Sequence, residues 1–204
     1  RHSFPTRRSS DLGIPIAMNL DIGDFDRGEF VEKLLIQAPA NAHGTFYFNG
    51  VALTTITQGG KTWFFLTADY AFGHALEKDS AAVVTANGGK VLGSVRHPFP
   101  ASDFSSFLLQ AQASGAKIIG LANAGADTTN SIKQAAEFGI TPNQSLAGLL
   151  MFITDIHSLG LRTTQGMYLT EGFYWDLNDE TRAWSKRFFG VQKKMPTMVQ
   201  AGQY

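Results

Sequence analysis

The chain has 204 residues and no formal net charge, because 17 Lys and Arg residues balance 17 Asp and Glu residues. This balance lacks the basic footprint of a nucleic-acid-binding domain, so we expect no nucleic-acid partner. The absence of cysteine excludes disulfides, cysteine-ligated metals and thiol catalysis. No apolar run approaches the roughly 18 residues that a membrane-spanning helix needs, so we expect no direct membrane span.

The first 60 residues give only a weak structural pattern. Residues 1–12 read RHSFPTRRSSDL, which is basic and polar and has neither helical nor strand periodicity. We interpret them as a non-native, adaptor-like segment, so that the lack of a visible signal peptide carries no information. Residues 13–60 are an uncertain remnant of a first lobe or crossover, with a pattern compatible with a helix over 30–36 and a strand over 45–48.

From residue 61 onward, short apolar runs alternate with longer amphipathic stretches. Residues 62–67 form a continuous aromatic and β-branched run, which predicts a strand buried on both faces. Residues 71–87 predict a helix that the glycines at 88 and 89 terminate. The pattern predicts further strands at 90–95, 117–121, 146–150 and 166–170, and further helices at 104–113, 127–138 and 179–189. Ser102 and Asp103 are the expected cap of the second helix, and Asn178 or Asp179 that of the last.

Strands separated by helices of this length imply right-handed βαβ crossovers. The predicted fold class is therefore α/β, with a parallel β-sheet flanked by helices on both faces. In such sheets ligands bind outside the carboxyl ends of the strands, which selects the loops at 68–70, 98–102, 122–126, 152–156 and 171–175. Tyr70 and Phe152 in these loops either wall a small-molecule pocket or pack against neighbouring loops, and the sequence leaves both alternatives open.

The sequence contains no recognisable catalytic constellation. It has neither a G-x-S-x-G nucleophile elbow nor a glycine-rich nucleotide motif after a strand. None of the five histidines has the i, i+4 spacing of a helical zinc site. Asp155, His157 and Ser158 share one loop, whereas a catalytic triad needs a base oriented from another element. We therefore expect no enzyme, no cofactor and no metal site.

Several segments of the chain resemble, in the same order along the sequence, elements of type I periplasmic solute-binding proteins of the branched-chain amino-acid-binding kind. Residues 63–73, WFFLTADYAFG, resemble the D-Y-x-[YF]-G element of that family, and residues 103–105 resemble its D-F-[ST] helix start. Residues 113–119, 132–140 and 166–174 resemble the strand and helix rhythm that follows. The resemblance implies an incomplete two-lobe protein, in which residues 61–204 form one ligand-binding lobe that is truncated at the C-terminus.

The resemblance also places candidate ligand contacts in the loops after the strands. Phe72 takes the place of an aromatic wall residue, and Asn123 and Ala124 fall in a ligand-contacting loop. Amino-acid binders usually carry an acid at 150–152, where this chain has none, and Asp155 is the first acid available. An aromatic or aliphatic carboxylate, or an amide, therefore fits better than an α-amino acid. The candidate ligand-binding residues are Asp69, Tyr70, Phe72, Asn123, Ala124, Phe152, Asp155 and Phe173.

The function that the resemblance implies is solute capture for an ABC importer, with a small amino-acid-like ligand or an (aromatic) carboxylate or amide bound in a cleft between two lobes. The expected partners are a small-molecule ligand and the permease subunits in the membrane. The expected location is periplasmic or otherwise extracytoplasmic, through a signal peptide outside this fragment. One alternative is a ligand-sensing effector domain of a receptor or transcription regulator, which a helix-turn-helix or kinase segment on the same chain would favour. The other is an enzyme on an open α/β sheet.

Overall fold

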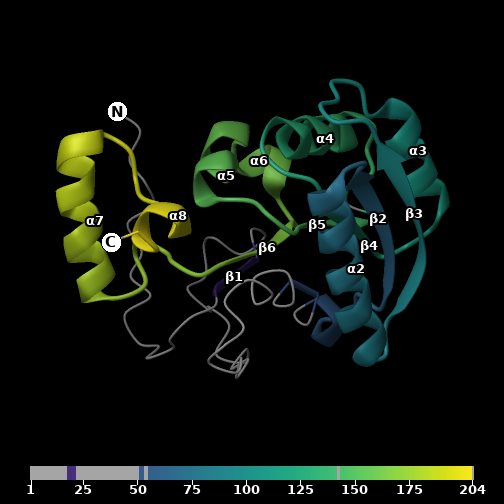
Figure 1. Ribbon diagram of the computed structural model, residues 1–204, viewed down its shortest axis with the longest axis horizontal. Coiled ribbons are helices and arrows are strands. Elements are labelled where there is room, and N and C mark those ends of the chain that lie inside the picture. The colour runs from purple at the N-terminus through teal and green to yellow at the C-terminus, as the bar shows by residue number, and fades with distance from the viewer. Residues whose placement is uncertain (1–17, 22–50, 53–54, 142, 204) are drawn as a thin grey trace.

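The computed structural model describes residues 18–21, 51–52, 55–141 and 143–203 (Figure 1). The adaptor-like segment 1–12, the helix considered at 30–36 and the strand considered at 45–48 lie outside these residues. The described strands form one six-stranded sheet. Its order across the sheet is β1 (Met18–Asp21), β6 (Tyr168–Glu171), β5 (Ser145–Gly148), β4 (Ile118–Ala122), β2 (Thr62–Ala68) and β3 (Lys90–His97).

The five strands from β2 to β6 are parallel, which confirms the predicted α/β class. The register pairs Ala68 with His97 and Leu121 with Gly148, so these strands end at the same edge of the sheet. The sequence did not predict β1, which pairs antiparallel with β6 through Met18 and Glu171.

The helices that follow the predicted pattern are α2 (Ala71–Ala86), α3 (Ser105–Ala113), α4 (Ala126–Glu137) and α7 (Asp179–Gln192). The sequence did not predict α5 (Ile153–Leu159) and α6 (Leu161–Thr164), which are short and meet at Gly160. The last short helix is α8 (Met198–Ala201). Within the described part of the chain, no helix combines the length and apolar character needed to cross a bilayer.

Two apolar cores lie on opposite faces of the sheet, because successive strand residues point to opposite sides. Trp63 and Phe65 of β2 are fully buried on the face covered by α2. Phe64 and Leu66 face the other way and pack with residues of α3, α4 and α5. Burial on both faces explains why β2 is a continuous apolar run rather than an alternating one.

The α7 and α8 helices lie at one end of the molecule, away from the sheet beyond α5 (Figure 1). Asn178 caps α7, because its side-chain oxygen accepts a hydrogen bond of 2.9 Å from the backbone N–H of Thr181. Arg182 braces the same turn by donating to Asp176 at 2.9 Å and to Asp179 at 2.7 Å. The expected cap at Asn178 or Asp179 is therefore Asn178.

Candidate functional site

The candidate site lies at the carboxyl edge of the parallel strands. β2 pairs with β3 on one side and with β4 on the other, so the chain builds outward in two directions from β2. Ligands of open α/β sheets bind in the crevice at such a reversal of strand order. The residues that follow β2 and β4, among them Tyr70 and Asn123, therefore flank the position that this topology favours.

Helix α2 starts unusually close to this edge. A Cβ atom at Gly73 would lie 2.2 Å from the backbone oxygen of Ala68 and 3.0 Å from that of Ala122. Only glycine lets the first turn of α2 approach the ends of β2 and β4 so closely. The glycine of the D-Y-x-[YF]-G element thus holds Tyr70 and Phe72 against the carboxyl edge.

The loop after β2 presents a carboxylate and two aromatic rings. Asp69 is exposed, and its Oδ1 lies 2.8 Å from Nε2 of His74 and 3.8 Å from Nη1 of Arg96. The Tyr70 ring is partly exposed, with its centroid 5.9 Å from that of Phe72. The structure therefore brings these three predicted residues together at the end of β2.

Asn123 belongs to a buried polar network beneath the same edge. Its Oδ1 accepts a hydrogen bond of 2.8 Å from Thr128, and its Nδ2 lies 3.3 Å from Nε2 of His97. His97 donates from Nδ1 to the backbone oxygen of Pro98 at 2.8 Å, which leaves Nε2 to accept from the Asn123 amide. Asn123 is fully buried, whereas Ala124 beside it is partly exposed.

Phe152 and Asp155 open helix α5 next to the end of β5. The backbone N–H of Phe152 donates to Oδ2 of Asp155 at 2.9 Å, so the carboxylate caps its own helix. Burial raises the pKa of Asp155, although the Phe152 N–H opposes this shift. Asp155 therefore stabilises the first turn of α5 in this structure. The Phe152 side chain beside it is partly exposed.

Glu171 at the end of β6 is an acid that the sequence analysis missed. Its Oε1 accepts a hydrogen bond of 2.9 Å from the Ile153 N–H, while its Oε2 is buried and has no hydrogen-bond partner. Burial raises the pKa of Glu171 to about 8, the Ile153 N–H opposes the shift, and the charge of Asp155 adds to it. The signal in the sequence was an acidic residue directly after the strand predicted at 166–170, where the carboxyl edge was expected.

The neighbouring Tyr174 belongs to the same buried group. Burial is the main reason that the pKa of its phenol is raised, and the charges of Asp176 and Glu171 add to the effect. Three ionisable side chains therefore lie close together here: Asp155, Glu171 and Tyr174. Of these, Glu171 is a carboxyl group that is largely protonated at neutral pH.

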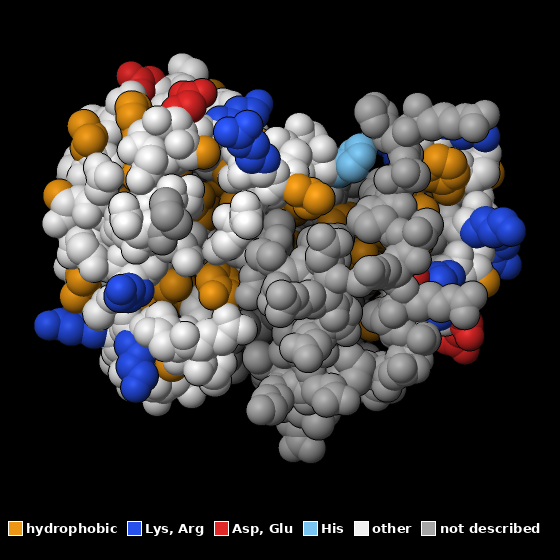
Figure 2. Space-filling view, turned by 180° about the vertical axis from the view of Figure 1, so that it is seen from behind, with side chains coloured by type: hydrophobic (Ala, Val, Ile, Leu, Met, Phe, Trp, Pro, Cys, Tyr) orange, Lys and Arg blue, Asp and Glu red, His pale blue; other side chains and the backbone are white. Residues whose placement is uncertain are grey.

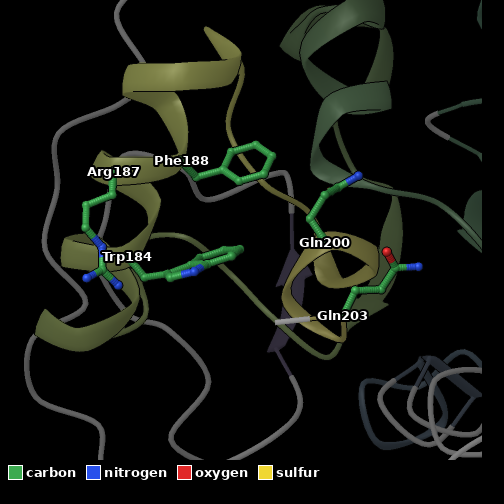
Figure 3. Close-up of a pocket in the computed structure, with 5 residues that line it drawn as sticks. All are labelled: Trp184, Arg187, Phe188, Gln200 and Gln203. Atoms are coloured by element: carbon green, nitrogen blue, oxygen red, sulfur yellow. The ribbon is translucent and has the colours of Figure 1, made fainter.

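The structure places Phe173 differently from the other candidates. Its ring packs edge-on against Trp184 of α7, with 5.3 Å between the ring centroids. A cavity of about 430 Å³ lies between α7 and α8 (Figure 3). It is lined by Trp184, Arg187, Phe188, Gln200 and Gln203, none of which is a predicted ligand residue.

The charged groups of the described residues form no metal site, and on one face of the molecule they are spread apart. No group of three or more His, Asp or Glu side chains there is arranged to hold a metal ion. On the face shown in Figure 2, the described charged side chains are scattered over both ends of the molecule. The carboxyl edge supplies hydrogen-bonding groups, aromatic rings and the exposed carboxylate of Asp69.

Comparison with known proteins identifies the family. The model of the periplasmic binding protein family matches residues 43–204. The chain belongs to this periplasmic binding protein family. No curated protein sequence matches it.

Solved structures of periplasmic binding proteins share the fold. A periplasmic binding protein from Burkholderia mallei is 64% identical, with a TM-score of 0.72 over 76% of this chain and 41% of that chain. A branched-chain amino-acid ABC transporter periplasmic ligand-binding protein from Burkholderia xenovorans LB400 is 43% identical, with a TM-score of 0.69 over 77% and 42%.

A more distant relative carries a bound ligand. The solute-binding protein of an ABC transporter from R. palustris, solved in complex with benzoate, is 22% identical, with a TM-score of 0.68 over 78% of this chain and 45% of that chain. This likeness concerns the fold alone. The chain spans less than half the length of each of these three relatives.

Proposed function

We propose that this periplasmic binding protein chain is a ligand-binding lobe of the extracytoplasmic solute-binding subunit of an ABC importer. The observation that carries the proposal is the common carboxyl edge, where Asp69 and Tyr70 follow β2 and Asn123 and Ala124 follow β4 at the reversal of strand order. The 43% identical relative is described as a periplasmic ligand-binding protein of an ABC transporter, which supports the same role. The working location is then outside the cytoplasm, where the permease receives the ligand.

The proposed ligand is a small carboxylate or amide with an apolar or aromatic body. Tyr70 and Phe72 supply aromatic surface beside the edge. Asp155 and Glu171 favour this class over an α-amino acid, because Asp155 caps α5 and Glu171 is buried and largely protonated at neutral pH. Neither acid is then a free carboxylate for the ammonium group of an amino acid.

The proposed mechanism is capture without chemical conversion. Polar groups at the strand ends orient the ligand, and the aromatic rings remove its apolar part from water. A second lobe closes over the ligand by a hinge motion, and the closed form is the one that the permease subunits bind. The ligand stabilises the closed state only to the extent that it binds this state more tightly than the open one.

The test is a thermal-shift screen of the full-length protein against aromatic acids, aliphatic acids, amides and amino acids. A ligand that binds only the native state stabilises it by RT ln(1 + [L]/Kd), about 2.7 kcal/mol at a hundredfold excess over Kd. We expect a concentration-dependent rise in Tm with at least one carboxylate or amide, and unchanged ligand after incubation. A screen without any shift would contradict the proposal, and consumption of the ligand would indicate an enzyme.

A further inference from the structure

Phe99 is a large apolar side chain that the fold leaves exposed at the carboxyl edge. It follows the end of β3, and 56% of its surface is accessible. Its ring stacks on that of Tyr70, with a centroid distance of 4.6 Å and an interplanar angle of 24°. Phe99 thus covers one face of an aromatic residue that flanks the strand-order reversal between β2 and β4.

The loop that carries Phe99 is fixed on both sides. Before it, His97 is fully buried and bonds the backbone oxygen of Pro98. After it, the Ala101 N–H donates to Oδ1 of Asp127 at 3.2 Å.

A second anchor lies slightly further along the same loop. Gln134 of α4 accepts from the Phe104 N–H at 2.8 Å and donates to the backbone oxygen of Ser102 at 2.9 Å. The exposed ring of Phe99 therefore sits on a segment that α4 and the buried His97 hold in place, and not on a free loop.

The backbone of Tyr70 is fixed as well. Its N–H donates to the Ala68 oxygen at 2.8 Å, its own oxygen accepts from His74 at 3.0 Å, and Asp69 extends the ladder by donating to the His97 oxygen at 2.8 Å. With both backbones anchored, the plane of the Tyr70 ring is set by its ring contacts, of which the one with Phe99 at 4.6 Å is closer than the one with Phe72 at 5.9 Å. A rigid ring is suited to a partner with a defined plane, because aromatic pairs prefer particular offset or edge-on geometries.

We propose that Phe99 is a positioning residue that holds the Tyr70 ring as a flat wall, and that the site thereby prefers ligands with an aromatic ring over saturated ligands of the same size and charge. The inference rests on the proposed function, whose site it refines. The contacts of an aliphatic ligand with the Tyr70 ring depend little on the orientation of that ring. An aromatic ligand stacks favourably only when the Tyr70 ring keeps a fixed plane, so it loses its advantage when that ring can rotate. Phe99 acts through Tyr70 and need not touch the ligand.

The experiment compares benzoate with cyclohexanecarboxylate, which differ in aromaticity but share charge and approximate size. Calorimetric titration of the full-length protein should show that benzoate binds about three- to tenfold more tightly than cyclohexanecarboxylate. This factor corresponds to the free energy of one aromatic pair. Phe99→Ala should reduce this ratio to within about twofold, and Phe99→Tyr, which keeps a ring for stacking, should restore it. Phe138→Ala is the matched control, because Phe138 is 42% exposed at the other end of α4, and it should leave the ratio unchanged.

The ratio distinguishes positioning from mere structural support. Equal weakening of both probes in Phe99→Ala would indicate a structural role and overturn the inference, as would an unchanged ratio. A full-length protein that binds cyclohexanecarboxylate as well as benzoate, or binds neither, would also overturn it. Binding of any other carboxylate or amide in the wider screen would still support the proposed function, so the two proposals fail separately.

Discussion

The carboxyl edge has two halves, and each contains a buried carboxylate with one oxygen that lacks a hydrogen-bond partner, Asp127 in one half and Glu171 in the other. In the half that follows β2, β3 and β4, His97 uses both ring nitrogens and Asn123 is bonded at both ends of its amide. In the half that follows β5 and β6, Glu171 satisfies one oxygen and leaves the other buried without a partner. Oδ1 of Asp127 accepts from the Ala101 N–H and its Oδ2 lies 3.7 Å from Nδ1 of His97, whereas Glu171 lies near the like charge of Asp155. We therefore expect the half with Glu171 to be the one whose stability depends most on pH.

Glu171 should give the largest effect, as a pH dependence of stability. Its folded pKa of about 8 exceeds the ordinary 4.5, so the folded protein keeps a proton that the unfolded chain has released between these values. Stability should therefore be fully present below the unfolded pKa and fall as pH rises, by as much as ~4 kcal/mol between about pH 5 and pH 8. Urea unfolding at several pH values measures the slope.

Glu171→Gln should remove this slope, because glutamine can keep the acceptor for the Ile153 N–H without an ionisable group. The variant should be more stable than the wild type near pH 8 and not more stable near pH 4. The control Glu180→Gln changes an exposed acid of α7 and should leave the slope in place. A wild-type slope that persists in Glu171→Gln would show that another group titrates.

Gly73→Ala should disrupt the packing of α2 against the carboxyl ends of β2 and β4 and so destabilise the protein. The new Cβ would meet backbone oxygen at 2.2 Å, so α2 has to move away from β2, at a cost of about 3 kcal/mol. Gly190→Ala in α7 is the matched control, since nothing lies within 4 Å of its Cβ, and it should stabilise by about 0.5–1 kcal/mol through helix propensity. Thermal unfolding of the two variants should therefore shift in opposite directions, and a neutral Gly73→Ala would contradict the close approach of α2.

Asn123→Leu tests the paired network at nearly constant volume. Loss of the amide leaves Nε2 of His97 and Oγ1 of Thr128 buried without this partner, which should cost about 2 kcal/mol in chemical unfolding. Thr128→Val removes only one of the two bonds and should cost about half as much. Equal costs for the two variants would mean that the bond between Asn123 and His97 contributes nothing.

Asp69→Asn should have the smallest effect on stability. Both Asp69 and its partners are well exposed, and surface ion pairs contribute less than about 1 kcal/mol. We expect a change in Tm within the error of a thermal scan, together with a measurable change in ligand affinity if Asp69 contacts the ligand as predicted. A large loss of stability would show that Asp69 is a structural residue.

Local sequence was informative wherever an element is long and buries a continuous face. The aromatic run at 62–67 became β2, and the helix predicted at 71–87 became α2 with a difference of one residue at its end. The short helices α5 and α6 escaped detection, because α5 begins with a hydrogen bond from Ile153 to the distant Glu171. A helix of seven residues has too few turns for an apolar period to be visible.

The sequence by itself determined the α/β class, the parallel direction of the central strands and the loops that carry Tyr70, Asn123 and Phe152, because periodicity and turn residues act locally. Only the tertiary structure decided which of these side chains are engaged within the protein. It buried Asn123 against His97, turned Phe173 towards Trp184 and brought Glu171 to α5. These outcomes depend on contacts between residues far apart in the chain, and burial and hydrogen-bond pairing are set only when those residues meet.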